Sequence, residues 1–151
     1  MEIRPVDRGE LPQLLQLYRQ LHGEGWLEEG PKAQALWETI LKSPGYTIVV
    51  AAEGGRLWST CTLLVVPNLT HQGRPYGVVE NVVTHEERRG QGLAGACLAY
   101  AKELAQKEHC YKLMLMTGRK DAATLDFYRK AGYRSDEKTA FVQWLQNDIM
   151  P

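Results

Sequence analysis

A glycine-rich, basic turn between a predicted strand and a predicted helix contains the residues of this chain that are best suited to bind an anion. The stretch runs from Glu80 to Gly95 and places Arg88 and Arg89 directly before four small residues: Gly90, Gly92, Ala94 and Gly95. The first N–H groups of a helix have no partner within it, and the helix dipole adds partial positive charge there. The pattern indicates a pyrophosphate-binding turn, and a plain glycine-rich connection with a solvated basic surface is the alternative.

Two common nucleotide-binding motifs do not fit this turn. Gly90, Gly92 and Gly95 match the spacing of the dinucleotide motif, whose glycines follow their strand closely. Here the polar residues 85–89 intervene, and the acidic residue expected about 20 positions further on is absent from residues 112–117. The P-loop pattern GxxxxGK[ST] is also absent. Hydride transfer and nucleotide hydrolysis are therefore disfavoured.

Hydrophobic spacing predicts the elements that position the turn. Apolar residues recur with helical or alternating periods, separated by glycine and proline breaks. The predicted strands are 2–6, 46–52, 57–66, 76–84 and 112–117, with one or two more in 133–145. The predicted helices are 11–21, a stretch after Pro31 that residues 43–45 break, 93–108 and 121–130. The apolar run 113–116 is typical of a strand buried on both faces. The unit from 76 to 117 should be a right-handed crossover with parallel strands, which makes the sheet mixed.

Length and composition limit the possible classes of protein. The 151 residues suit one domain, and 44% apolar and 24% charged residues are ordinary for a globular protein. Eighteen basic residues balance eighteen acidic ones, which argues against a nucleic-acid partner. No apolar run reaches the roughly 18 residues of a membrane span, and no signal peptide is recognisable. We therefore expect a cytosolic protein with neither nucleic acid nor membrane as a partner.

Cysteines and histidines show no pattern of metal binding. The three cysteines include no CxxC pair, and the four histidines have no HxxxH spacing. Neither a disulfide framework nor a metal site is expected. Cys97, on the apolar side of a predicted helix, should behave as a small buried residue.

Two segments resemble the GNAT superfamily of acyl-CoA-dependent N-acyltransferases. Residues 89–94 fit the signature [Q/R]-x-x-G-x-[G/A], and residues 126–133 are similar to the motif F-Y-x-x-x-G-[F/Y]. The predicted order of elements also matches the family fold, most strongly from Tyr76 to Tyr133. The resemblance implies one N-acetyltransferase domain over residues 1–151. Its α/β fold would have a mixed central sheet of about six or seven strands and about four flanking helices. The parallel fourth and fifth strands, 76–84 and 112–117, would splay apart.

By this resemblance the co-substrate is acetyl-CoA, and no metal is needed. Backbone amides of residues 90–95 would hold the pyrophosphate, and the backbone of residues 82–84 would run beside the pantetheine arm. Asp121 stands where asparagine is common in the family, and Thr124 replaces a frequent alanine. The implied cofactor-binding residues are Val82, Val83, Thr84, Arg88, Arg89, Gly90, Gln91, Gly92, Leu93, Ala94, Gly95, Asp121 and Tyr128.

The catalytic candidates are Tyr128 and Glu80. Tyr128 resembles the family's tyrosine that protonates the departing thiolate, a step that a phenol of pKa about 10 can supply to a thiolate of pKa about 8.5. The alternative is that Tyr128 only packs its helix on the sheet. Glu80 could accept the ammonium proton directly or through water. Alternatively, Glu80 is an ordinary exposed carboxylate without a catalytic role, and ordered water serves as the base. A backbone amide within residues 82–84 could polarise the carbonyl.

The acceptor in this family contacts the segment between the first two helices and the loop before the fourth strand. The first is residues 22–30, whose carboxylates surround Trp26 and could hold a cationic amine, although a solvated acidic face is the alternative. In the second, Arg74 could bind a carboxylate or a phosphate. We expect transfer of an acetyl group to the primary amine of a small molecule, by direct attack in a ternary complex. A protein acetyltransferase and a non-catalytic acyl-CoA-binding module are the alternatives. Phe141 and Trp144 suggest the edge of a homodimer.

Overall fold

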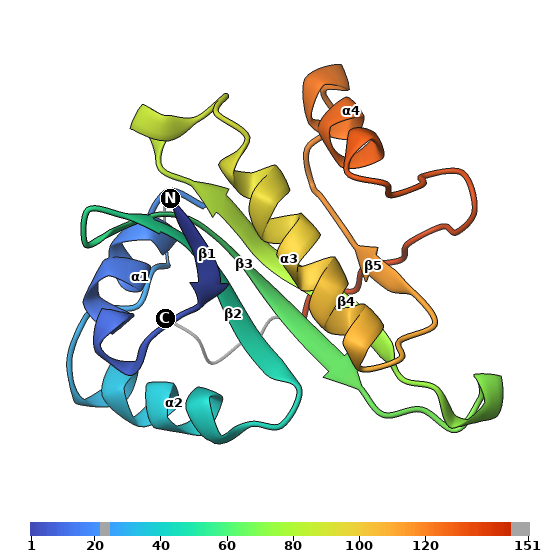
Figure 1. Ribbon diagram of the computed structural model, residues 1–151, viewed down its shortest axis with the longest axis horizontal. Helices are drawn as coiled ribbons and strands as arrows, with labels where there is room; N and C mark the ends of the chain where they lie inside the picture. Colours follow the sequence, from blue (N-terminus) through green and yellow to red (C-terminus); the bar gives the residue numbers. More distant parts are fainter. Residues whose placement is uncertain (22–24, 146–151) are drawn as a thin grey trace. The chain divides into compact units, whose positions relative to one another are not determined.

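The computed structural model describes residues 1–21 and 25–145. The chain divides into two compact units, Met1–Leu115 and Met116–Pro151. The first unit contains the sheet and the helices α1, α2 and α3, and the second contains α4, Ala122–Lys130 (Figure 1). Among the described residues, no helix is long and apolar enough to cross a bilayer.

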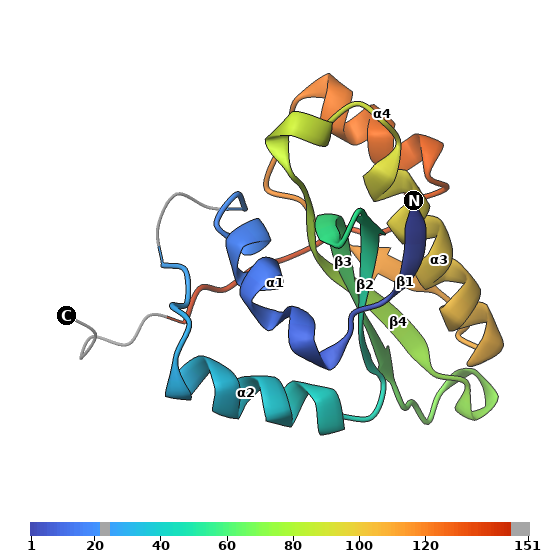
Figure 2. The same ribbon diagram turned by 60° about the vertical axis from the view of Figure 1, so that its left-hand side comes forward.

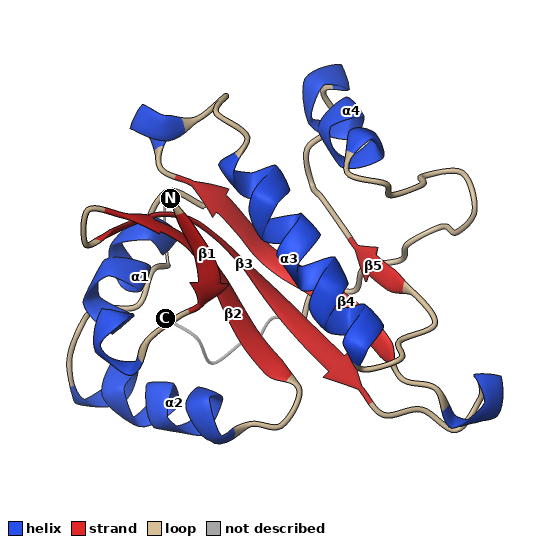
Figure 3. Cartoon of the chain, in the orientation of Figure 1, coloured by secondary structure: helices blue, strands red, loops and turns tan. Residues whose placement is uncertain are grey.

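The sheet of the first unit follows the chain order β1-β2-β3-β4-β5 (Figure 3). β1 is Glu2–Pro5, β2 is Tyr46–Glu53, β3 is Arg56–Val66, β4 is Tyr76–Thr84 and β5 is Leu113–Leu115. The first four strands pair antiparallel, and β5 pairs parallel to β4. The sequence predicted this mixed sheet, including the β2–β3 hairpin, in whose turn Gly54 and Gly55 both have positive φ.

Helices cover both faces of the sheet. α1, Leu11–Tyr18, and α2, Pro31–Lys42, lie against one face, and α3, Leu93–Lys107, lies against the other (Figure 2). The core beneath α1 and α2 includes Leu14, Leu17, Trp37, Ile48, Val50, Leu57 and Val83. On α3, Cys97 is fully buried as predicted, and burial raises the pKa of its thiol to about 11.

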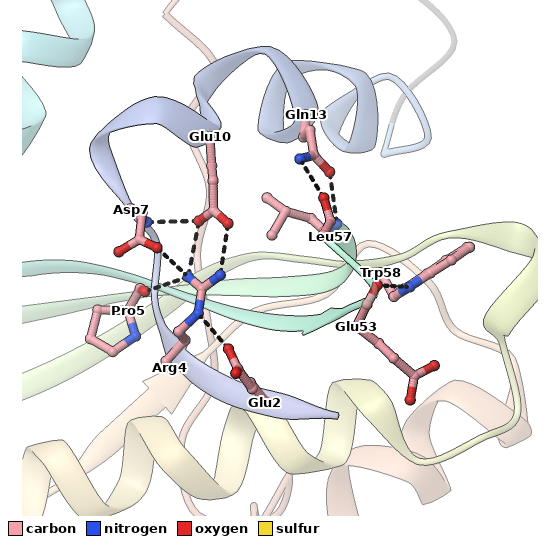
Figure 4. A network of polar contacts seen from close by, with 10 residues as sticks. Glu2, Arg4, Pro5, Asp7, Glu10, Gln13, Glu53, Leu57 and Trp58 are labelled. Carbon is pink, nitrogen blue, oxygen red and sulfur yellow. Dashed lines mark hydrogen bonds and ion pairs between the residues drawn. The ribbon is translucent and has the colours of Figure 1, made fainter.

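A polar network ties α1 to the strands (Figure 4). The guanidinium of Arg4 donates two hydrogen bonds to the carboxylate of Glu10, at 3.0 and 2.7 Å. These bonds hold the pKa of Glu10 below its ordinary value. Gln13 accepts a hydrogen bond from the Leu57 N–H at 2.9 Å and donates one to the Gly55 carbonyl at 3.0 Å. The ion pair thus fixes the residue before α1 to β1, and Gln13 fixes α1 itself to the β2–β3 hairpin.

Two predictions about the strands were wrong. The described sheet has five strands and not six or seven, because residues 133–145 form no strand, and Phe141 and Trp144 are 91% and 83% exposed. A β-prone sequence forms a strand only against a backbone partner, and the described part of the second unit offers none. The dimer edge suggested for this segment stays a prediction. The apolar run at β5 is also not buried on both faces, since Met114 in this edge strand is 40% exposed.

Candidate active site

β4 contains a bulge at the centre of the candidate site. Val83 is opposite Thr60 and Glu80 is opposite Thr62, so residues 81 and 82 together oppose Cys61. Asn81 has φ of 53°, in the left-handed region that asparagine tolerates better than most residues. The extra residue shifts the alternation of β4 by one, so Glu80 and Val83 face the same side of the sheet.

Beyond the bulge, one edge of β4 is unpaired. The parallel pairing with β5 ends at Val79 and Leu115, whereas β4 continues to Thr84. No other strand of the described chain pairs with this edge. Val83 is 6% exposed and belongs to the core, so only its backbone is available to a ligand. The hydroxyl of Thr84 lies 2.8 Å from that of Ser59, which anchors this end of the strand.

The turn between β4 and α3 presents a row of free backbone amides. Gly90 and Gly92 have φ of 74° and 78°, and the first helical bond runs from the Ala96 N–H to the Gly92 carbonyl at 3.0 Å. Within residues 1–21 and 25–145, no group accepts a hydrogen bond from the N–H groups of residues 90–95. A Cβ atom added at Gly90, Gly92 or Gly95 would meet nothing within 4 Å. These amides are therefore unpartnered in the described chain at the positive end of α3, and the three glycines leave the space beside them open.

Arg88 holds the turn against the hairpin. Its guanidinium donates to the Gln91 side chain at 2.8 Å and to the Glu53 carboxylate at 3.0 Å. It also lies 4.8 Å from the ring centroid of Trp58. The ion pair with Arg88 lowers the pKa of Glu53. The sequence suggested an anion-binding side chain, but it held no signal for these contacts, because Glu53 and Trp58 are distant in the chain.

Arg89 also makes contacts within the protein. Its Nε donates to the Thr84 carbonyl at 3.2 Å, and an Nη atom lies 3.5 Å from the side-chain oxygen of Gln20. The same oxygen accepts the Glu86 N–H at 2.8 Å. Gln20 lies just after α1 and thus connects the end of that helix to the turn. The sequence alone did not indicate this contact.

Glu80 is exposed on β4. Its carboxylate forms no hydrogen bond or ion pair with any residue of the described ranges. Register pairs Glu80 with Thr62 and Thr62 with Ile48. Residues paired directly across strands share a face, so Glu80 faces the same side of the sheet as Ile48 and the α1–α2 layer.

Asp121 and Tyr128 belong to the second unit. Asp121 caps α4: its carboxylate accepts hydrogen bonds from the Thr124 N–H at 3.0 Å and the Thr124 hydroxyl at 2.8 Å. These bonds lower the pKa of Asp121 to about 2. The half-buried ring of Tyr128 makes edge contacts with Phe127 and Tyr133, with centroids 4.9 and 6.4 Å apart. The helix cap explains why aspartate suits position 121 structurally.

A cavity of about 320 Å³ lies between α1, α2 and the sheet. It reaches the bulge of β4, because Asn81 forms part of its wall. Its other walls include Tyr18, Trp26, Trp37, Tyr46 and Ile48. None of the described residues lining this cavity carries a charge. Sequence reasoning missed it, because its walls come from well-separated elements.

Two residues of the acidic segment predicted to hold the acceptor, Trp26 and Glu28, contact each other and Arg19. Glu28 accepts hydrogen bonds from Arg19 at 3.0 Å and from the Trp26 indole at 3.1 Å, and Arg19 lies over the Trp26 ring. His22, Gly23 and Glu24 lie outside the described residues.

Arg74 is likewise engaged within the protein. It donates to the carbonyls of His109 and Cys110, each at 3.1 Å. In the part of the chain that the structure describes, no group of histidine, cysteine or acidic residues could hold a metal.

The chain with this sheet and glycine turn belongs to a known family. The model of the Acetyltransferase (GNAT) family matches residues 11–133. A glucosamine 6-phosphate N-acetyltransferase of Trypanosoma brucei brucei is 34% identical over 84 residues, which cover 56% of this chain and 55% of that protein. This match therefore spans only about half the length of the curated relative.

Solved structures agree with the family assignment. An Agrobacterium tumefaciens protein assigned as an acetyltransferase superimposes with a TM-score of 0.91 and 43% identity, covering 97% of this chain and 100% of that one. The glucosamine-6-phosphate N-acetyltransferase of Arabidopsis thaliana has a TM-score of 0.84 at 19% identity, covering 96% and 98%. The second similarity shows the shared fold alone.

Proposed function

We propose that this protein transfers an acetyl group from acetyl-CoA to the primary amine of a small molecule. The observation that carries the proposal is the row of unpartnered N–H groups at residues 90–95, at the positive end of α3. Such amides bind diphosphates without any side-chain contribution. Membership of the acetyltransferase family supplies the rest of the argument.

The unpaired edge of β4 is the second part of the proposed coenzyme site. The backbone of residues 82–84 lies beyond the pairing with β5, so its polar groups are available to the amide groups of a pantetheine arm. An N–H group there can also polarise the thioester carbonyl, which develops negative charge during attack. Arg88 and Arg89 maintain the shape of the turn through their contacts with Glu53, Gln20 and Thr84.

The reaction needs two proton transfers beside the attack itself. The neutral amine attacks the thioester carbon, the carbon–sulfur bond breaks, and the acetyl group leaves with the nitrogen. Glu80, exposed and without a partner in the described chain, takes the proton lost by the amine, directly or through water. Tyr128 provides the proton for the departing thiolate. The acceptor occupies the cavity that ends at Asn81, on the bulge of β4.

Two measurements test this function. Acetyl-CoA should raise the melting temperature of the purified protein, because a ligand that binds only the native state stabilises it. Release of free thiol should then be screened over primary amines, amino sugars, polyamines and lysine-containing peptides. A protein with no thermal response to acetyl-CoA would refute the proposal. A thermal response with turnover of peptides alone would identify a protein acetyltransferase instead.

The role of Tyr128 has its own test. Tyr128→Phe keeps the ring and removes the hydroxyl, so we expect thiol release to fall by about 100-fold or more while the thermal response to acetyl-CoA persists. Full turnover by this variant would mean that Tyr128 serves only packing.

A further inference from the structure

The cavity beside the β4 bulge has walls that are aromatic and aliphatic. Trp37 is 1% exposed, and its indole N–H is already bound to the Arg8 carbonyl at 2.9 Å, so it offers an occupant only its ring. Ile48 is 4% exposed and closes the floor from β2. The indole N–H of Trp26 is likewise bound, to Glu28 at 3.1 Å. The remaining polar groups among the described lining side chains are two phenols and one amide, on Tyr18, Tyr46 and Asn81.

From these walls we infer the class of acceptor: a primary amine carried on an uncharged, apolar framework, such as an arylalkylamine. The inference rests on the proposed function, since it assumes that the cavity receives the acceptor. A volume of about 320 Å³ suits a small molecule, at the lower end of the range for ligand pockets.

Highly charged acceptors do not match these walls. A phosphorylated sugar would leave its phosphate without a cation, since no described lining residue is basic, and an unpaired buried charge is strongly disfavoured. A polyamine or aminoglycoside would need several carboxylates. None of the described lining residues is acidic, and Glu28, next to the lining residue Leu27, is paired with Arg19 at 3.0 Å. The phosphosugar named for the trypanosome relative is therefore not the acceptor that these walls favour.

The polar groups of the cavity lie where an amine is needed. Burial raises the pKa of Tyr18 to about 12, and it also raises the pKa of Tyr46, so both phenols stay neutral. Neutral hydroxyl groups and the Asn81 amide can bind an uncharged amine. The apolar surroundings favour that uncharged form, which is the nucleophile. Because Asn81 sits on the bulge beside Val82, the amine end would point toward β4 and the framework toward Trp37.

A pair of variants on one helix tests the inference. Leu36 on α2 lines the cavity and is 48% exposed, so Leu36→Lys places an ammonium at the cavity with little cost to folding. Ala35→Lys adds the same charge at an exposed neighbouring position that does not line the cavity. For each protein, kcat/KM is measured with 2-phenylethylamine, glucosamine 6-phosphate and spermidine. Binding of 2-phenylethylamine alone is followed through the intrinsic tryptophan fluorescence, to which the cavity residues Trp26 and Trp37 contribute.

We expect the wild type to prefer 2-phenylethylamine over glucosamine 6-phosphate by about 100-fold or more in kcat/KM. Leu36→Lys should reduce that preference at least about tenfold, because it places a charge beside the apolar framework and attracts the phosphate, and Ala35→Lys should leave it unchanged. A preference for the phosphosugar or for spermidine would overturn the inference and leave the acetyltransferase function intact. The inference would also be overturned if the protein responded to acetyl-CoA but its fluorescence did not respond to millimolar 2-phenylethylamine. Loss of the acetyl-CoA response itself would instead refute the underlying function.

Discussion

The turn before α3 and the cavity beside α1 and α2 both belong to the first unit, yet they are built from different parts of the chain. The turn uses backbone N–H groups of the contiguous residues 90–95 and depends on glycine conformation at Gly90 and Gly92. The cavity uses side chains from α1, α2, β2 and β4, together with the segment between the two helices. A backbone site recognises a constant chemical group with little dependence on side chains. A side-chain site can change its ligand with each substitution.

This difference predicts separable effects of mutation. Changes in the cavity should alter the acceptor or the stability and leave coenzyme binding in place. Changes at the turn should alter coenzyme binding without destabilising the fold. Variants in each region can therefore show whether the two sites are as independent as their construction indicates.

The largest effect is expected from the cavity wall. Trp37→Ala removes a side chain that is 1% exposed and leaves the Arg8 carbonyl without its indole donor. We expect a loss of about 3–5 kcal/mol in the free energy of unfolding, measured by urea denaturation. At low temperature the folded fraction should still gain stability from acetyl-CoA.

Trp37→Phe is the control for this prediction. It keeps most of the apolar volume and should cost clearly less stability than Trp37→Ala. If either variant, while folded, lost its response to acetyl-CoA, the two regions would not be independent.

The next effect is expected at the turn, with opposite consequences for stability and binding. Gly95 lies in the first turn of α3, and a side chain there would enter open space. Gly95→Glu should leave the melting temperature unchanged or raise it, since glutamate is a better helix former and interacts favourably with the helix dipole. The same carboxylate would repel a diphosphate, so the Kd for CoA should rise about 100-fold, measured by calorimetry.

Gly95→Ala separates charge from size at this position. It adds a Cβ atom in the same open space without a carboxylate, so CoA affinity should change by less than about threefold. Unaltered CoA binding by Gly95→Glu would mean that the diphosphate is not held at these amides.

The turn is contiguous in sequence and the cavity is not, and this difference decides how well each could be predicted from the sequence. Glycine spacing before a helix is visible in a contiguous segment, so the turn could be recognised directly, and the hydrophobic periods located the strands and helices to within a few residues. The bulge of β4 could not be recognised, because it depends on the register in which Thr60 and Thr62 meet Val83 and Glu80. That register is a property of two strands together.

The cavity was not predicted from the sequence, and the fold of residues 133–145 was predicted wrongly, for related reasons. The side chains of Tyr18, Trp37 and Asn81 become neighbours only after three separate elements pack together. The sequence also does not show that one carboxylate of the acidic segment, Glu28, meets Arg19 in the folded chain. Residues 133–145 have strand-like composition, and composition does not show whether a backbone partner is present. Long-range pairing decided all of these outcomes.

A smaller effect distinguishes two roles of Arg88: holding the turn in place, or binding the diphosphate directly. Arg88 is tied to Glu53 at 3.0 Å and lies over Trp58. If it acts by holding the turn in place, Arg88→Ala and Glu53→Gln should each raise the KM for acetyl-CoA severalfold with kcat nearly unchanged, because exposed ion pairs contribute little. If Arg88 instead contacts the diphosphate directly, removing the competing carboxylate in Glu53→Gln should lower this KM. The contacts within the protein favour the first result.

The smallest effect concerns how α1 is held beside the cavity. Arg4 lowers the pKa of Glu10 from its ordinary value of 4.5. The unfolded chain therefore binds more protons than the folded one as the pH falls through this range, so the stabilisation is complete above 4.5 and is lost below the folded pKa. Glu10→Gln should cost about 1 kcal/mol at neutral pH and should flatten the fall of the melting temperature with acid. Glu103→Gln, at an exposed position on α3, should keep the full slope. An unchanged acid slope in Glu10→Gln would show that other carboxylates, such as Asp121 with its pKa of about 2, account for the acid sensitivity.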